Sequence, residues 1–296
     1  MFDQFRLKEA LVRYKQDFVA MEWKNEKYKW EAVKWFQDHW DVNATDFPAM
    51  LNTALDKTFN LLASANNFPK GMIVGFAKSA PEEVRAMFID LFDESKDVYE
   101  RIDAFKLGSS KLLERYGNGA AQHYQLENAI TTYLWLRYPD RYYIYKFSEV
   151  KVVAAELEAD YRFKKGAYAD NVRSFIKLYD EICSMLQTDQ ELINLLRAQL
   201  TDTCYPDPEL RTLTIDVGFY ISRYYSQRDA EQTAPEEWVG ADYNPNLSVE
   251  DWKGLLQDET VFTPSALQIM KRMKDYGGTA SCTQLAVKYG ETKNFY

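Results

Sequence analysis

The sequence is poor in the residues that build metal centres and disulfide frameworks. Its 296 residues include three cysteines and two histidines, and no two cysteines have the C-x-x-C spacing. A structural zinc site needs four Cys or His ligands at short spacings, and a disulfide framework needs paired cysteines. The sequence therefore predicts neither a metal site nor a disulfide framework.

Glycine and proline are also scarce, at 12 and 9 residues, and no apolar run approaches the ~20 residues of a transmembrane helix. The N-terminus has no signal-peptide pattern, so we expect a cytoplasmic protein. Long stretches with apolar residues at helical spacing predict a mainly α, multi-helix globular domain with at most a short β element, Tyr142–Tyr145. The expected helices cover residues 3–40 (one or two, with a break near 24–29), 47–65, 96–115, 126–139, 149–160, 170–186, 188–200 and 211–225.

An acidic stretch with two prolines and a glycine divides the chain. Residues 227–247 predict a linker or long loop, because such composition neither continues a helix nor fills a core. This division gives a helical domain with an aromatic-rich centre at residues 1–226. A smaller C-terminal helical segment follows at residues 248–296.

The end of that C-terminal segment has the pattern of the first half of a helix-turn-helix. In Thr279–Tyr296 the small Ala286 would let a partner helix approach, and Gly290, four residues later, would supply the turn. A plain helical hairpin explains the same spacing.

Charge is distributed unevenly along the chain. The net charge of −9 is opposite in sign to that of a typical small DNA-binding domain. Residues 226–262 contain nine acidic and two basic residues, whereas residues 141–177 contain eight basic and five acidic residues. If nucleic acid binds, its phosphates should contact the second region; the alternative is an ordinary solvated surface.

The segment Tyr133–Lys146 holds five tyrosines and one tryptophan around a Pro-Asp break. Such rings could stack on a planar ligand such as a nucleobase, or they could form the aromatic centre of a core. In a strand, Tyr143 and Tyr145 would share one face and Tyr142 the other, so the rings cannot all reach one ligand. The candidate base-binding residues are Trp135, Tyr142, Tyr143 and Tyr145, and the candidate phosphate contacts are Arg137, Arg141 and Lys146.

No catalytic motif is present, although one pattern matches the residue order of a metal-dependent nuclease motif. Pro139-Asp140 and Glu149-Val150-Lys151 match P-D…E-x-K. That chemistry holds magnesium between two carboxylates and needs the E-x-K residues on one face of a strand. Ser148 instead predicts a helix start, where residues two apart diverge by about 200°. A nuclease is therefore the least supported function.

Several segments resemble the N-terminal regions attached to McrB-like AAA+ GTPases. They are Asn67–Phe88, Tyr133–Lys146, Leu213–Ile221 and Leu247–Trp252, and Gly277–Tyr296 is similar to the connector of the same family. The resemblance implies the target-recognition region of the GTP-driven motor subunit in a modification-dependent (type IV) restriction system for phage defence.

The same resemblance implies that the chain binds DNA and reads a methylated cytosine by base flipping, while a separate nuclease subunit cuts. It implies no cofactor for this chain, which has no Walker A motif. GTP, magnesium and oligomer formation are expected of a motor domain that follows, and no membrane is involved. The acidic net charge favours an alternative, a helical protein–protein interaction domain that does not contact DNA.

Overall fold

The computed structural model describes residues 1–63, 68–166, 168–225, 248–258 and 261–276. The chain divides into two units, Met1–Thr233 and Ala234–Tyr296. The described residues form helices and no β-strand, which confirms the mainly α fold. The predicted linker at 227–247 and the helix-turn-helix-like stretch at 279–296 lie outside the described residues.

The first unit begins with a nearly continuous helical segment that changes its winding twice. It consists of α1 (Gln4–Asp17), the π-helix η1 (Phe18–Glu22), α2 (Trp23–Glu26) and α3 (Tyr28–His39). Asp3 caps α1, because its carboxylate accepts a hydrogen bond from the Phe5 amide at 2.8 Å. The break predicted near residues 24–29 occurs at Lys27, between α2 and α3.

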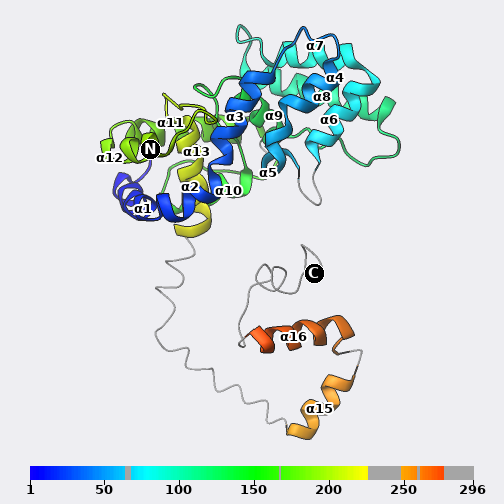
Figure 1. Ribbon diagram of the computed structural model, residues 1–296, viewed down its shortest axis with the longest axis vertical. Coiled ribbons are helices and arrows are strands. Elements are labelled where there is room, and N and C mark those ends of the chain that lie inside the picture. Colours follow the sequence, from blue (N-terminus) through cyan, green and yellow to red (C-terminus); the bar gives the residue numbers. More distant parts are fainter. Residues whose placement is uncertain (64–67, 167, 226–247, 259–260, 277–296) are drawn as a thin grey trace. The chain divides into compact units, whose positions relative to one another are not determined.

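The next helices gather at one end of the unit (Figure 1). They are α4 (Phe47–Ala54), the short 3₁₀-helix η2 (Asp56–Thr58), α5 (Phe59–Leu62), α6 (Pro69–Ser79), α7 (Pro81–Leu91) and α8 (Val98–Tyr116). Proline occupies the first position of α6 and of α7, where its fixed φ suits a helix start and its missing N–H is not needed.

The remaining helices of the unit are α9 (Glu127–Arg137), α10 (Phe147–Glu156), α11 (Tyr168–Leu186), α12 (Gln190–Gln199), α13 (Arg211–Tyr220) and the π-helix η3 (Ile221–Tyr225). Figure 1 shows α1, α11, α12 and α13 at the end opposite α4 and α6–α8, with α3 and α9 between the two groups. Nine of the eleven α9 residues are buried, so this helix is the centre of the core. Its surroundings therefore decide what the aromatic segment can contact.

The predicted strand Tyr142–Tyr145 is wrong, because the segment pairs with no other strand among the described residues. Side chains of α9 take the place of a strand partner. The Tyr145 amide donates to Thr131 Oγ1 at 3.0 Å, and Asn128 Nδ2 donates to the Tyr145 carbonyl at 2.9 Å. These bonds satisfy the buried backbone without a sheet.

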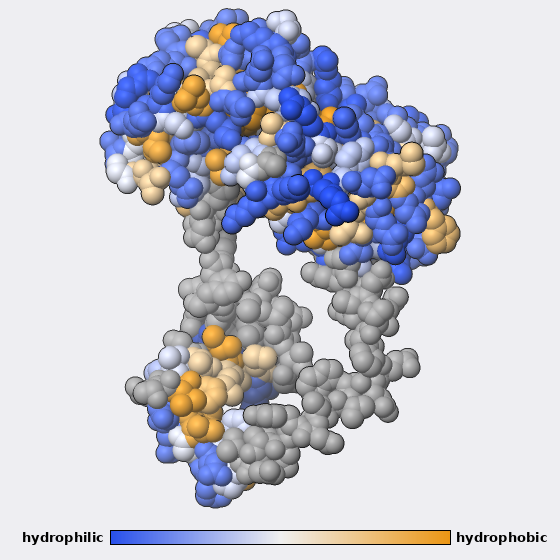
Figure 2. Space-filling model, turned by 180° about the vertical axis from the view of Figure 1, so that it is seen from behind, coloured by the Kyte–Doolittle hydropathy of each residue, from blue (hydrophilic) through white to orange (hydrophobic). Residues whose placement is uncertain are grey.

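The second unit contains α15 (Val249–Gln257) and α16 (Pro264–Tyr276). A capping box begins α15: Ser248 Oγ accepts from the Asp251 amide, and the Asp251 carboxylate accepts from the Ser248 amide. Figure 2 shows hydrophobic side chains gathered on this unit, where Val249, Trp252 and Met270 are exposed. In neither unit is a described helix long and apolar enough to cross a membrane.

Candidate functional site

Two of the four rings predicted to bind a base lie deep in the core. Trp135 on α9 is 0% exposed, and its indole N–H donates to Thr212 Oγ1 at 3.2 Å. Tyr143 is 2% exposed, and its hydroxyl donates to Asp180 Oδ1 at 2.9 Å. Because neither ring has a face open to a ligand, both act as core residues in this structure.

Unlike Tyr143, Tyr142 belongs to a polar network with Glu94 and Arg101. Its hydroxyl donates to the Glu94 carboxylate and accepts from Arg101 at 2.8 Å. Burial and then the Glu94 carboxylate raise the pKa of Tyr142 above its usual value. Tyr143 and Tyr145 both pack edge-on against Phe175 instead, so the predicted alternation of these rings holds without a strand.

The three predicted phosphate contacts are all engaged by neighbours within the unit. The Arg137 guanidinium lies 4.9 Å from the centre of the Tyr138 ring. Arg141 forms an ion pair with Glu94, and Lys146 Nζ lies 3.5 Å from Glu149 Oε2. Exposed ion pairs of this kind are weak, so phosphate could still compete for Arg141, whose side chain is 63% exposed.

Of the four candidate rings, Tyr145 lines a cavity. This cavity, of about 250 Å³, is formed where the starts of α9, α10 and α11 meet. Its volume is just below the ~300–1,000 Å³ that is typical of sites for drug-sized ligands. The cavity therefore suits one small ring system rather than a large cofactor. Its lining residues are Leu126, Glu127, Asn128, Tyr145, Phe147, Lys165, Gly166, Tyr168 and Asn171.

Three rings of this Tyr145 cavity differ in how firmly they are held. Tyr145 is 4% exposed and packs on Phe175 with 5.3 Å between ring centres. Burial, followed by the nearby Glu127 carboxylate, raises the pKa of Tyr145 to about 12, so its hydroxyl stays protonated. Phe147 is half-buried, whereas Tyr168 is 54% exposed and free to adjust to a ligand.

Polar groups of the cavity are placed by contacts behind it. Glu127 is 6% exposed and forms an ion pair with Lys106, whose ammonium lies 4.6 Å from the centre of the Tyr168 ring. Asn171 is buried and clamps the preceding loop: its Oδ1 accepts from the Lys164 amide at 3.0 Å, and its Nδ2 donates to the Lys164 carbonyl at 2.7 Å. The loop is thereby fixed at the cavity edge.

That loop carries a group of uncompensated cations. Arg162, Lys164 and Lys165 are exposed, and none of them forms an ion pair with another described residue. Gly166 then reverses the chain with φ of 88°, a left-handed conformation that favours glycine, shortly before α11 begins. The basic region predicted from charge thus lies partly beside the Tyr145 cavity.

Sequence reasoning missed Phe147, Tyr168, Asn128 and Asn171 as site residues. One local signal could have found Tyr168: an aromatic residue at a helix start, just after the Lys-Lys-Gly turn. The two asparagines had no such signal, because contacts between distant segments define their roles.

The nuclease-like residues do not form a metal site. The helix α10 begins at Phe147 with Lys146 at the N-cap, so the prediction that Ser148 caps it is wrong. Glu149 and Lys151 are nevertheless on a helix and point apart, while Asp140 accepts a hydrogen bond from Tyr205 at 2.6 Å. No group of three or more potential Cys, His, Asp or Glu ligands occurs within the described part of the chain.

Comparison with protein-family models, with curated proteins and with solved structures found no match to this chain. The site therefore has to be interpreted from its own chemistry.

Proposed function

We propose that this chain is the DNA target-recognition module of a McrB-like, GTP-dependent restriction motor and that it reads a methylated cytosine. The observation that carries this proposal is the Tyr145 cavity, which is lined by rings and by Lys165, with Lys164 and Arg162 on the same loop. A ring-lined cavity of one-base size next to unpaired cations suits a base that has left its duplex.

In this proposal the flipped base enters between Tyr168 and Phe147. Stacking on aromatic rings contributes ~1–3 kcal/mol per base in single-stranded nucleic acid complexes. The Glu127 carboxylate is the natural acceptor for the exocyclic amine of cytosine, and Leu126 offers apolar contact to a methyl group. Burial of a methyl group contributes only about 0.8 kcal/mol, so discrimination requires a close fit around it.

The loop cations contact the phosphates on either side of the flipped nucleotide. Such contacts fix register and supply affinity but carry no sequence information. They also reconcile DNA binding with a net charge of −9, since residues 141–177 around this loop contain more basic than acidic residues. GTP, magnesium and the partner nuclease subunit belong to this proposal through the resemblance to the McrB-like family.

Fluorescence anisotropy with methylated and unmodified duplexes, titrated at several salt concentrations, tests the proposal. We expect tighter binding of the methylated duplex and a linear fall of log affinity with log salt. The double variant Lys164→Ala/Lys165→Ala should lower the affinity for both duplexes, whereas the matched control Lys78→Ala/Lys111→Ala, on α6 and α8, should not. Absence of binding to either duplex at low salt would refute the proposal.

A second candidate function is a docking domain for a protein partner. The acidic charge and the exposed Val249, Trp252 and Met270 of the second unit favour it. This function predicts no DNA binding at any salt concentration, so the same titration separates the two candidates.

A further inference from the structure

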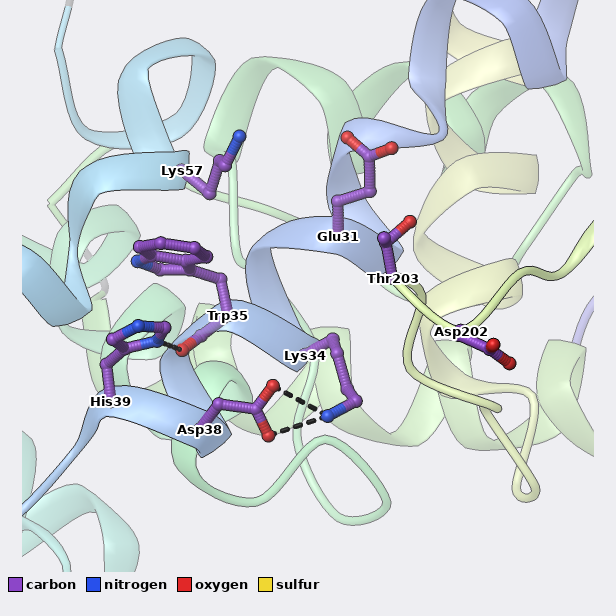
Figure 3. A pocket seen from close by; sticks show the side chains of 8 residues that line it. All are labelled: Glu31, Lys34, Trp35, Asp38, His39, Lys57, Asp202 and Thr203. Carbon is purple, nitrogen blue, oxygen red and sulfur yellow. Dashed lines mark hydrogen bonds and ion pairs between the residues drawn. The ribbon is translucent and has the colours of Figure 1, made fainter.

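A second cavity, of about 340 Å³, lies beside α3 and has a different chemical character (Figure 3). One tryptophan provides its aromatic surface, and three carboxylates surround it. Its lining residues are Glu31, Lys34, Trp35, Asp38, His39, Lys57, Asp202 and Thr203. We refer to it as the Trp35 cavity.

The Trp35 ring is held in a fixed orientation. Its indole N–H donates to the Thr53 carbonyl at 2.7 Å, and the His39 ring stacks on one face with 3.8 Å between ring centres. The histidine is itself fixed, because its Nδ1 lies 2.8 Å from the Trp35 carbonyl oxygen one turn earlier on α3. A rigid ring with one covered face leaves the other face available to a ligand.

The ammonium group of Lys57 lies over the other face of the Trp35 ring. Lys57 Nζ lies 5.6 Å from the centre of the Trp35 ring, and Figure 3 shows Lys57 and His39 on opposite sides of the indole. Tryptophan is the aromatic side chain that attracts cations most strongly. Lys57 is exposed and forms no ion pair with the described residues, so little holds it in place.

Two of the three carboxylates around the ring are already paired with lysines. Both carboxylate oxygens of Asp38 lie 2.6 Å from Lys34 Nζ, so this lysine is already neutralised. Glu31 pairs with Lys27, outside the cavity, at 3.2 Å. Asp202 is exposed and has no cationic partner among the described residues. Asp202 is therefore the carboxylate of the cavity that remains available to a cationic ligand.

We infer that the Trp35 cavity binds a small organic cation with a primary alkylammonium group, which replaces Lys57 over the Trp35 ring. The ammonium would lie on the open indole face, and Asp202 would be the carboxylate that balances its charge. This inference does not depend on DNA binding, because none of these residues belongs to the Tyr145 cavity.

Isothermal titration calorimetry with 1,5-diaminopentane tests the inference, with 1,5-pentanediol and glutarate as neutral and anionic probes of similar length. Only the diamine should bind. Lys57→Met removes the internal competitor and should tighten diamine binding about threefold to tenfold, the range expected of a cation–π contact. The control Lys24→Met makes the same charge change on α2 and should leave the affinity unchanged.

Two further variants test the proposed contacts. Trp35→Leu should abolish diamine binding, and Asp202→Asn, an exposed change that leaves the core intact, should weaken it severalfold; circular dichroism checks the fold of both. Equal tightening by Lys57→Met and Lys24→Met would show a general charge effect and overturn the inference. So would equal affinity for the diol or glutarate, or failure of the Lys57→Met variant to bind the diamine.

Discussion

Two aromatic regions lie less than one helix apart in the sequence. In the structure the first is buried in the core, whereas the second lines a cavity. Trp135 and Tyr143 are buried, and their polar atoms bond to Thr212 and Asp180. Around Tyr145 the rings enclose a cavity, and cations at its edge lack partners. Aromatic density alone therefore does not separate rings that fill the core from rings that line a cavity.

The largest expected effect concerns the enclosed region. Trp135→Ala should lower the free energy of unfolding by about 3–5 kcal/mol, because it removes a fully buried indole and leaves a cavity in the centre of the core. Urea denaturation measures the change. Tyr168→Ala, at a ring that is 54% exposed, is the control and should change stability by no more than ~0.5 kcal/mol. A large loss of stability in Tyr168→Ala with little loss in Trp135→Ala would mean that Tyr168, and not Trp135, belongs to the core.

The enclosed interior also contains buried polar atoms without a hydrogen-bond partner, among them those of the Glu22 carboxylate. Asp216 is paired with Lys29 and accepts a hydrogen bond from Tyr14 at 2.5 Å. Glu22, on η1, is 0% exposed, and neither of its carboxylate oxygens has a hydrogen-bond partner. Burial, followed by the charge of Asp216, raises the pKa of Glu22 from 4.5 to about 8, so the carboxyl is protonated at neutral pH.

This shift predicts a pH dependence of stability. Below about pH 4.5 Glu22 is protonated in both the folded and the unfolded state; between 4.5 and 8 only the folded state keeps the proton. Stability should therefore fall as pH rises through this window, by at most ~1.4 kcal/mol per unit, and level off above pH 8. Urea denaturation of wild type and Glu22→Gln at a series of pH values isolates the effect, because other titrating groups cancel in the difference. If the difference in free energy of unfolding between wild type and Glu22→Gln stays constant with pH, the prediction is contradicted.

Periodicity predicted the long helices well and their ends less well. The helix expected at 170–186 spans Tyr168–Leu186, and the one expected at 96–115 spans Val98–Tyr116, because each buries one continuous apolar face. Caps depend on one hydrogen bond and are harder to predict. In the helix expected at 188–200, Asp189 accepts from the Leu192 amide and α12 begins at Gln190.

The Tyr145 cavity was predictable only in part. Tyr145 was identified from composition and Phe147 is only two residues away, but Tyr168 reaches the cavity because the chain folds back before α11, and sequence distance hides such a contact. Trp135 was misjudged for a related reason. Helix α9 is buried on nearly all sides, so its few polar side chains bond within the core and its apolar pattern has no solvent face.

A moderate effect is expected on ligand binding in the open region. Tyr168→Ala should weaken binding of methylated DNA by about 1–3 kcal/mol, the contribution of one stacked base, while stability stays near that of wild type. Tyr168→Phe preserves the stacking ring and should retain most of the affinity, which makes it the matched control. Anisotropy titration gives both values; equal losses from the two variants would mean that the ring does not stack on a base.

The smallest expected effect concerns a single cation on the loop that precedes α11. Arg162→Ala removes one phosphate contact, so the slope of log affinity against log salt should become shallower by about 0.9. Methylated and unmodified duplexes should lose affinity equally, because a phosphate contact carries no base information. Lys151→Ala, which removes an exposed cation on α10 and outside that loop, is the control. If Arg162→Ala instead changes the preference for the methylated duplex, the arginine contacts the base, and the division between ring-lined cavity and phosphate-binding edge has to be redrawn.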